Sequence, residues 1–275
     1  MKYLLPALFV AIALQLGTAP TAQAQAPTSA TTYSGPRYPG GPDSLRALVY
    51  RSTRITTPAP AGKMLVQFEL QPDGKAFNFT MVRPPDPMNK ALVDATAAAR
   101  NYVEANMLAW QLDKPGTTGA SIKAPKISLA MEFTTLPAAQ AYYYADHEPV
   151  FKDATEALRA TFSKFRVSPN DSVQQHLFAS PSRILAEHIQ SKVKYPPNAL
   201  RSGQQGQVYV YFEVAENGAI DNPQVVGTAG KYLDDEVLKV VKNLSAASAP
   251  AQLRGQPVRV YYTLPINFKI VKPRS

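Results

Sequence analysis

The residue types that most often perform catalysis or bind metals are sparse in this chain. It contains three histidines and no cysteine. The nearest approach to a ligand cluster is Asp146-His147-Glu148, but consecutive residues on an extended chain point to opposite faces and cannot easily close on one ion. Zinc sites use spaced ligands. We therefore expect a solvated loop at this position and no metal.

Other catalytic patterns are also missing from the sequence. His147, His176 and His188 show no paired arrangement, and no Gly-x-Ser-x-Gly motif, phosphate loop or Cys-His pair occurs. The adjacent carboxylates Asp234 and Asp235 are better explained as charges that complement a helix N-terminus. The sequence favours a protein that is not an enzyme and that uses no cofactor.

The last third of the chain predicts a strand, a turn, a second strand, a helix and a third strand. The segment 208–214 is rich in Val, Tyr and Phe and alternates with the period of a half-buried strand. Asn217-Gly218 supplies the positive φ that a tight hairpin turn needs, so 220–226 can return antiparallel. Apolar residues between 233 and 244 lie at helical spacing, and 258–271 is rich in β-branched and aromatic residues, as expected of a strand.

Several short motifs occur in the same order around these elements. They are Tyr195-Pro196-Pro197-Asn198-Ala199, the glycines Gly203 and Gly206, Gly255-Gln256-Pro257-Val258, and the ending Leu264-Pro265-Ile266-Asn267-Phe268. Together they resemble the C-terminal domain of TonB, the periplasmic end of the outer-membrane energy transducer. One departure is Ser248, where the family usually has Trp.

The resemblance implies a peptide-binding module. In that family an extended peptide, from a segment near the plug of an outer-membrane receptor, adds to the edge of the sheet along its closing strand, a mode of binding that uses main-chain hydrogen bonds. Carried onto matching positions, the docking strand would contain Arg259, Tyr261, Thr263 and Leu264. Tyr195 and Pro196, before the first strand, are further candidates. For Leu264 and Tyr195, a role in core packing alone remains an alternative.

An earlier part of the chain repeats this pattern. Five residues recur at a constant offset of 144 positions: Gly62, Val66, Phe68, Glu69 and Gly74 reappear as Gly206, Val210, Phe212, Glu213 and Gly218. A helix-favouring stretch from 89 to 108, Trp110, and a strand-like segment from 127 to 133 follow. Repeats on this scale usually mean duplicated domains, so we expect two tandem lobes, the first divergent.

Short leaders precede both predicted lobes. Tyr38-Pro39-Gly40-Gly41 and the helix-favouring residues after it resemble a segment found ahead of related domains, and Pro149-Val150-Phe151 resembles an eroded copy. Two unrelated amphipathic helices are the alternative, because short motif matches carry a false-positive risk.

The first residues have the three parts of a secretory signal peptide. A lysine at position 2 precedes the apolar run 4–14, and Ala22-Gln23-Ala24 fits a small-x-small cleavage site. The apolar run is shorter than the roughly 20 residues of a membrane anchor. The sequence predicts cleavage near Ala24 and a periplasmic chain; retention of this segment as an anchor is the alternative.

The formal net charge is +9, yet the basic residues are spread along the chain and form no dense run. This pattern favours a solvated basic face over nucleic-acid binding, and it allows weak contact with anionic polymers of the cell envelope.

These observations predict an α+β fold with two tandem lobes, each a three-stranded antiparallel sheet packed with helices in a ββαβ core. The expected boundaries are a signal peptide over 1–24, a flexible linker over 25–36, a divergent lobe over 37–134, an inter-lobe region with a helix over 135–181, and a TonB C-terminal-like domain over 182–275. The expected partner is a TonB-dependent receptor or another envelope protein, with a homodimer through the sheet edges also possible. A self-associating or cell-wall-binding structural protein is the alternative function.

Overall fold

The computed structural model describes residues 31–85, 87–112, 124–133, 140–165, 177–178 and 180–270. The predicted signal peptide and the first part of the predicted linker lie outside the described residues. Among the residues that are described, no helix is both long and apolar enough to cross a membrane.

The first lobe is a three-stranded antiparallel sheet with two helices on one face. Its elements are α1 (Gly41–Ser52), β2 (Gly62–Leu70), β3 (Ala76–Met81), α2 (Lys90–Asn106) and β4 (Lys126–Phe133), and the strand order is β3-β2-β4. Alternate residues of β2, namely Met64, Val66 and Phe68, turn toward the helices and are almost fully buried. The strand prediction over 127–133 and the helix prediction over 89–108 are confirmed within two residues at each end.

The second lobe has the same arrangement. It contains α5 (Pro181–Lys192), the short α6 (Pro197–Arg201), β6 (Gly206–Val214), β7 (Ile220–Gly227), α7 (Lys231–Lys242) and β10 (Val260–Phe268), with the strand order β10-β6-β7. The α+β class with two such sheets is thus confirmed. The expected long third strand over 258–271 is wrong in extent, because Val258 belongs to β9 (Gln256–Val258) and β10 ends at Phe268.

Residues related by the offset of 144 positions also make the same hydrogen bonds in the two lobes. Asn78 and Asn222 both have positive φ, 56° and 50°, and both lie beside an irregularity in strand register. Each donates its side-chain amide to the equivalent glutamate of the neighbouring strand, Glu69 or Glu213. Two segments that share strand limits, bulge and bulge contact have the same local architecture.

A glycine at each hairpin turn is clamped by the segment that follows the helix. The amide of Trp110 donates to the Gly74 carbonyl at 2.8 Å, and the amide of Ala247 donates to the Gly218 carbonyl at the same distance. Both glycines have φ near +85°, and a Cβ at either would clash with the carbonyl oxygen of its clamping residue. Trp110 is therefore matched by Ala247, next to the Ser248 singled out in the sequence.

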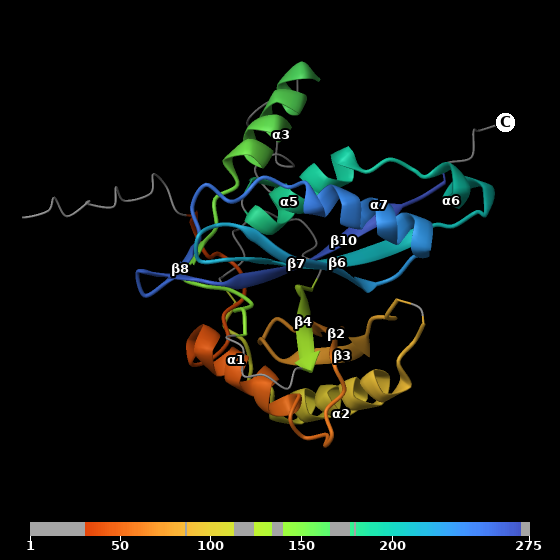
Figure 1. The fold of residues 1–275 in the computed structure, drawn as a ribbon. Helices are drawn as coiled ribbons and strands as arrows, with labels where there is room; N and C mark the ends of the chain where they lie inside the picture. Colours follow the sequence, from red (N-terminus) through yellow and green to blue (C-terminus); the bar gives the residue numbers. More distant parts are fainter. Residues whose placement is uncertain are drawn as a thin grey trace, which may run out of the picture.

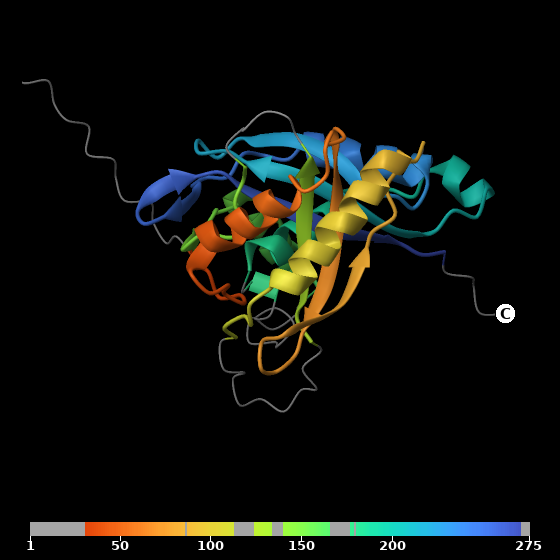
Figure 2. The same ribbon diagram turned by 90° about the horizontal axis from the view of Figure 1, so that it is seen from below.

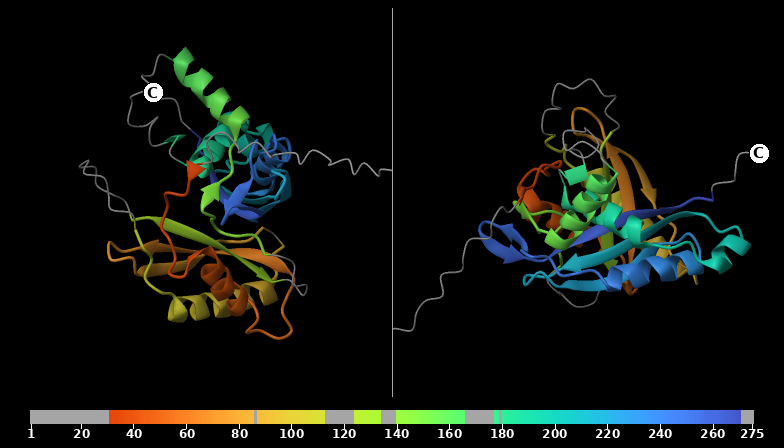
Figure 3. Two further views of the ribbon diagram at one scale, coloured as in Figure 1. Left: turned by 90° about the vertical axis from the view of Figure 1, so that its left-hand side faces the viewer. Right: turned by 90° about the horizontal axis from the view of Figure 1, so that it is seen from above.

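The two lobes stack through the sheet faces that carry no helices (Figure 1, Figure 3). Helices α5 and α7 lie on one outer side, and α1 and α2 lie on the other, where they cover the first sheet when the molecule is seen from below (Figure 2). The buried residues between the sheets, which we call the inter-lobe cluster, are Leu65, Ala130, Ala141, Tyr211, Val226 and Tyr261. Side chains alternate between the two faces of a strand, so each sheet supplies one face to its own helices and the other to the neighbouring lobe.

A small third sheet joins the N-terminal segment to the second lobe. Its strands are β1 (Thr31–Thr32), β5 (His147–Glu148), β8 (Ala251–Leu253) and β9, in the order β1-β5-β8-β9. The expectation of a solvated loop at Asp146-His147-Glu148 is wrong: Glu148 pairs with Thr31 and is only 8% exposed. Strands of two or three residues leave no periodic signal in a sequence, which explains the error.

The predicted helix between the lobes is α3 (Lys152–Lys164). It buries Ala154 and Leu158 near its beginning, and its far end projects away from the body of the molecule (Figure 1). Each leader forms an antiparallel bridge, Arg37 with Gln111 and Val150 with Ala249.

Candidate functional site

The strand β10 lies at the edge of the second sheet, as the docking-strand prediction requires. In an antiparallel pair, the backbone groups of alternate residues point toward the partner strand and away from it. The backbone N–H of Tyr261 donates to the carbonyl of Tyr142, which lies outside the sheet. The backbone N–H and C=O groups of the odd-numbered residues of β10 therefore point to the open edge of the sheet. These residues are the ones that an added strand would contact.

One end of this open side is already occupied by the chain itself. Tyr142 forms a parallel bridge with Val260, in which its amide donates to the Arg259 carbonyl at 2.9 Å and its carbonyl accepts from the Tyr261 amide at 3.0 Å. Residues 140–143, which we call the strap, therefore take the place of a neighbouring strand over the beginning of β10.

The other end of the open side is closed by a side chain. The amide group of Gln190, on α5, accepts from the Asn267 amide at 2.9 Å and donates to the Asn267 carbonyl at 3.0 Å. This is the pair of hydrogen bonds that a residue of an added strand would make. Pro265, the next odd-numbered residue of β10 before Asn267, has no N–H to donate.

The free part of the edge is centred on Thr263. Its N–H and C=O point outward by the alternation along β10, and no hydrogen bond to them is formed by the residues that the structure describes. The carbonyls of Tyr261 and Pro265 flank this position on the same side. Of the four residues predicted for the docking strand, Thr263 alone offers both backbone groups.

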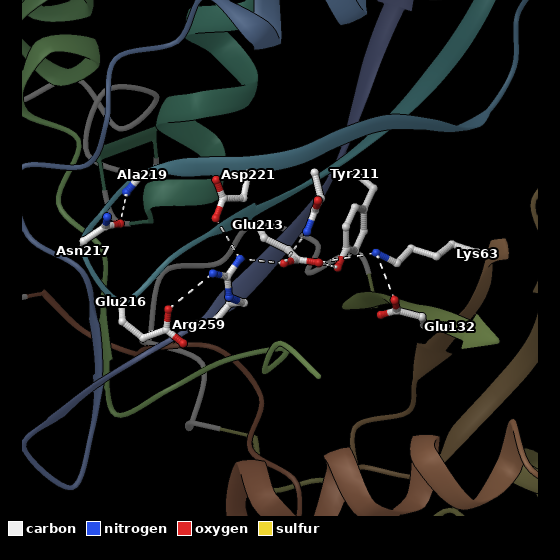
Figure 4. A network of polar contacts seen from close by, with 10 residues as sticks. Lys63, Glu132, Tyr211, Glu213, Glu216, Asn217, Ala219, Asp221 and Arg259 are labelled. Atoms are coloured by element: carbon white, nitrogen blue, oxygen red, sulfur yellow. Dashed lines mark hydrogen bonds and ion pairs between the residues drawn. The ribbon is translucent and has the colours of Figure 1, made fainter. Parts of the chain in front are cut away.

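Arg259 belongs to a network of charges that extends from the exposed Glu216 and the partly exposed Asp221 to the buried Glu213 (Figure 4). Its Nη1 lies 2.9 Å from Glu213 and 2.9 Å from Asp221, and its Nη2 lies 3.4 Å from Glu216. A guanidinium held by three carboxylates has few donors left for a ligand. The predicted role of Arg259 in docking therefore reduces to its backbone carbonyl, which already accepts from the strap.

The same network ties the two lobes together. Lys63, from β2 of the first lobe, lies 3.4 Å from Glu213 of the second lobe and 3.4 Å from Glu132 of its own lobe, and its Nζ stands 4.2 Å from the centre of the Tyr211 ring (Figure 4). The side chains of Lys63 and Glu213 are 9% and 8% exposed. Burial raises the pKa of Glu213, but hydrogen bonds from Tyr211 and Arg259 and the charge of Lys63 outweigh it, so that its pKa lies below the ordinary value.

Tyr261 and Leu264 are packing residues in this structure. The Tyr261 ring stacks on Tyr211 in the inter-lobe cluster, and its hydroxyl accepts from the backbone N–H of Ala130 at 3.3 Å. Leu264 points to the opposite side of β10 and is 3% exposed in the core of the second lobe. An added strand would meet the backbone of Tyr261, whereas the backbone of Leu264 pairs with β6, and the side chains of both residues are already buried.

Tyr195 and Pro196 lie apart from the free part of the edge. The Tyr195 ring packs edge-on against Phe268, and its hydroxyl donates to the Gln204 carbonyl. Pro196 is the residue that precedes α6. Both residues fix the chain entering the sheet at the far end of β10 from the strap.

The sequence reasoning missed Tyr142 and Gln190, the two residues that limit the open edge. Tyr142 lies in the run Tyr142-Tyr143-Tyr144, which was noticeable only as an aromatic cluster. Gln190 is an ordinary polar residue of a helix, and nothing in its neighbours along the chain indicates that it caps a strand. Both contacts join positions at least 77 residues apart.

A second group of residues has the types of a catalytic triad but not the arrangement. Asp153, His188 and Ser245 line one small pocket between α3, α5 and the segment after α7. The Nδ1 atom of His188 is buried and has no hydrogen-bond partner among the described residues. A triad requires the histidine to be oriented by such a bond, so the geometry does not favour catalysis here. The described part of the chain also holds no cluster of His, Cys, Asp and Glu that could bind a metal ion.

A comparison with protein families found a match within the second lobe. Residues 191–270 match the family of Gram-negative bacterial TonB protein C-terminal domains. The match runs from the end of α5 to the end of β10, and it includes β6, β7 and α7. The first lobe is not part of the TonB match, although its sheet has the same order and register. A comparison with curated proteins found no matching sequence.

Proposed function

We propose that this chain is a non-catalytic periplasmic protein that binds extended peptide segments of envelope proteins by strand addition to β10. The partner that the TonB match favours is a TonB-dependent outer-membrane receptor, and the role is an accessory one in transport across that membrane. The family that matches the second lobe is one of binding domains and not of enzymes, which supports a non-catalytic role.

The observation that carries this proposal is the outward-facing backbone of Thr263 on an edge strand within the TonB match. An edge strand with unpaired N–H and C=O groups is a template for an additional strand. Main-chain hydrogen bonds then provide affinity, and alternate side chains provide modest specificity.

The equivalence of the lobes supports a duplication, with the first lobe as a divergent second copy. The shared strand limits, the paired bulges at Asn78 and Asn222, and the paired glycine clamps are the observations behind this part of the proposal. The edge with the family's docking role lies in the second lobe, so we assign binding to that lobe and a covering role to the first.

The N-terminal residues and the TonB match together support a periplasmic compartment. We propose that the leader directs export, that it is cleaved near Ala24, and that the remaining chain resides in the periplasm. The mass of the mature protein in fractionated cells tests this. A chain that begins at Gln25 in the periplasmic fraction supports it, and an intact leader in the inner-membrane fraction contradicts it.

Two substitutions of opposite sign test strand addition. Thr263→Pro removes the single free N–H of the edge, and Pro265→Val restores an N–H at a position that now has none. Proline is tolerated on strand edges where the N–H faces solvent. In calorimetric titrations with a plug-region receptor peptide, we expect Thr263→Pro to weaken binding about tenfold, corresponding to the loss of about 1.4 kcal/mol, and Pro265→Val to strengthen it.

An equal affinity for the wild type and both variants would show that the peptide binds elsewhere. The exposed Leu200→Ala serves as a control, because Leu200 lies on α6, outside the edge, and is 48% exposed.

A further inference from the structure

The strap is anchored to the first lobe by side chains that have no part in the β10 sheet. The Tyr142 hydroxyl donates to Asp43 of α1 at 2.8 Å, and the guanidinium of Arg46 stands 4.0 Å from the centre of the Tyr142 ring. Arg46 also donates to the Gln140 carbonyl at 3.2 Å. Asp43 is held in turn by Arg254, at 2.5 Å. The strap therefore lies across the beginning of β10 because α1 holds it there.

The fit of the strap to the edge is incomplete. It makes the hydrogen bonds of one residue pair, whereas a docked strand of ordinary length would make several. The side-chain Nε2 of Gln140 is buried and has no hydrogen-bond partner among the described residues. A cleft lined by Arg46, Glu132, Tyr143 and other residues adjoins Gln140, so the strap does not fill the space beside it.

The packing of Ala141 and Tyr143 helps to hold the strap, but the strap makes only two main-chain hydrogen bonds to the edge, fewer than an added strand would make. A peptide that pairs with Thr263 and continues toward Arg259 would meet Tyr142 in the position of its own backbone, since one outward-facing N–H or C=O cannot serve two neighbouring strands at once. The peptide gains the Tyr261 N–H and the Arg259 C=O only when the strap leaves them.

We propose that residues 140–143 form an intramolecular strap that occupies the β10 edge in place of a peptide, and that Asp43 and Arg46 of the first lobe hold it closed. This inference rests on the proposed function of the β10 edge. It gives the first lobe a regulatory role, because the lobe that does not carry the TonB match controls how much of the docking strand is available.

Two variants open the strap in different ways. Tyr142→Phe removes the hydroxyl that bonds Asp43 and keeps the ring and the backbone. Tyr142→Pro also removes the N–H that donates to Arg259. We expect the plug-region receptor peptide to bind about threefold tighter to Tyr142→Phe and about tenfold tighter to Tyr142→Pro than to the wild type, because less of the binding energy displaces the strap. Tyr232→Phe, which removes the hydroxyl of a 42% exposed tyrosine on α7, should leave affinity unchanged.

Hydrogen exchange at the Tyr261 amide tests the same point on the full-length mature chain without relying on affinity alone. In the free Tyr142→Pro protein this amide should exchange faster than in the wild type, and added peptide should restore its protection. Folding of the variant is checked by unchanged protection of amides in β2, which lies in the other lobe.

The outcomes separate the strap from the binding function. If wild type and both Tyr142 variants bind the peptide equally and Thr263→Pro still weakens binding about tenfold, the β10 edge is the site and the strap proposal is wrong. If the Tyr142 variants bind more weakly, the strap is part of the site and the proposal is also wrong. If no variant binds any peptide, the proposed function fails and the strap proposal fails with it.

Discussion

At the scale of single residues, Glu148 is a carboxyl group that the fold buries at a cost. It lies in β5 near Tyr143 and Tyr262, and burial raises its pKa to about 7, which the charge of Arg183 offsets only in part. In the unfolded chain its pKa returns to about 4.5. Between these values the folded state binds more protons, so the free energy of unfolding falls as pH rises through this window.

We predict that Glu148→Gln removes this part of the pH dependence. The wild type should lose about 2–3 kcal/mol more stability than the variant between pH ~4.5 and pH ~8. Urea unfolding at several pH values measures the difference. The same slope in both proteins would mean that Glu148 is ionised in the folded protein at ordinary cost.

Lys63 presents the opposite case, a buried charge that is well compensated. Replacing it by Met leaves Glu213 and Glu132 without their shared cation at the lobe boundary. Removing one partner of a buried ion pair typically costs about 3–5 kcal/mol; because Glu213 keeps Arg259 and Tyr211, we expect about 2–3 kcal/mol for Lys63→Met at neutral pH.

The loss should shrink as the pH falls toward the pKa of Glu213, since protonation of Glu213 relieves its uncompensated charge. The matched control is Lys90→Met, which breaks an ion pair between Lys90 and Asp94. The Lys90 side chain is 86% exposed. Exposed pairs contribute at most about 1 kcal/mol, so this change should be small. Equal losses for the two variants would contradict the role given to Lys63.

At the scale of elements, each hairpin depends on a glycine held by the segment after the following helix. A Cβ at Gly218 would lie 2.5 Å from the carbonyl oxygen of Ala247, and its φ is +85°. Gly255 has a similar φ of +76°, but a Cβ there meets nothing within 4 Å. A comparison of Gly218→Ala with Gly255→Ala therefore separates the cost of backbone strain from the cost of the clash with Ala247.

We predict that Gly255→Ala costs about 1 kcal/mol and that Gly218→Ala costs at least about 2 kcal/mol more. Gly74→Ala in the first lobe should resemble Gly218→Ala, because its Cβ would clash with the Trp110 carbonyl. Denaturant unfolding gives the three values. A similar cost for Gly218→Ala and Gly255→Ala would show that the clamp yields without loss.

The sequence predicts the longer helices and strands of this fold well. Alternation over 208–214 and the turn residues Asn217-Gly218 depend on neighbours a few positions apart, and the structure confirms both strands of that hairpin. The small sheet of β1, β5, β8 and β9 was not predicted, since its strands are too short to show a period. The candidate edge strand was predicted through the TonB resemblance, whereas its closure by Tyr142 and Gln190 depends on contacts between distant segments.

At the scale of the whole molecule, each lobe hides the helix-free face of the other's sheet. Leu65 belongs to the inter-lobe cluster and is fully buried. Because that cluster and the Lys63 network span both lobes, we predict that the two lobes unfold together. Trp110, the only tryptophan, reports on the first lobe by fluorescence, and circular dichroism reports on both.

The two signals should give coincident transitions in the wild type, which is the usual sign of two-state unfolding. Leu65→Asp should separate them, with a loss of at least about 3 kcal/mol, because it places a charge in the buried cluster. The control Leu200→Asp changes an exposed leucine and should keep them together. Separate transitions in the wild type would mean that the lobes are independent.

The most direct test of peptide binding at β10 is the backbone amide signal of Thr263 in the isotopically labelled full-length mature chain, followed by NMR while a plug-region receptor peptide is added. The account predicts a shift of this signal and slowed hydrogen exchange at Thr263, with amides of β3 in the first lobe unchanged. Binding that leaves the Thr263 signal in place, or saturating peptide that shifts no signal in β10, would contradict it.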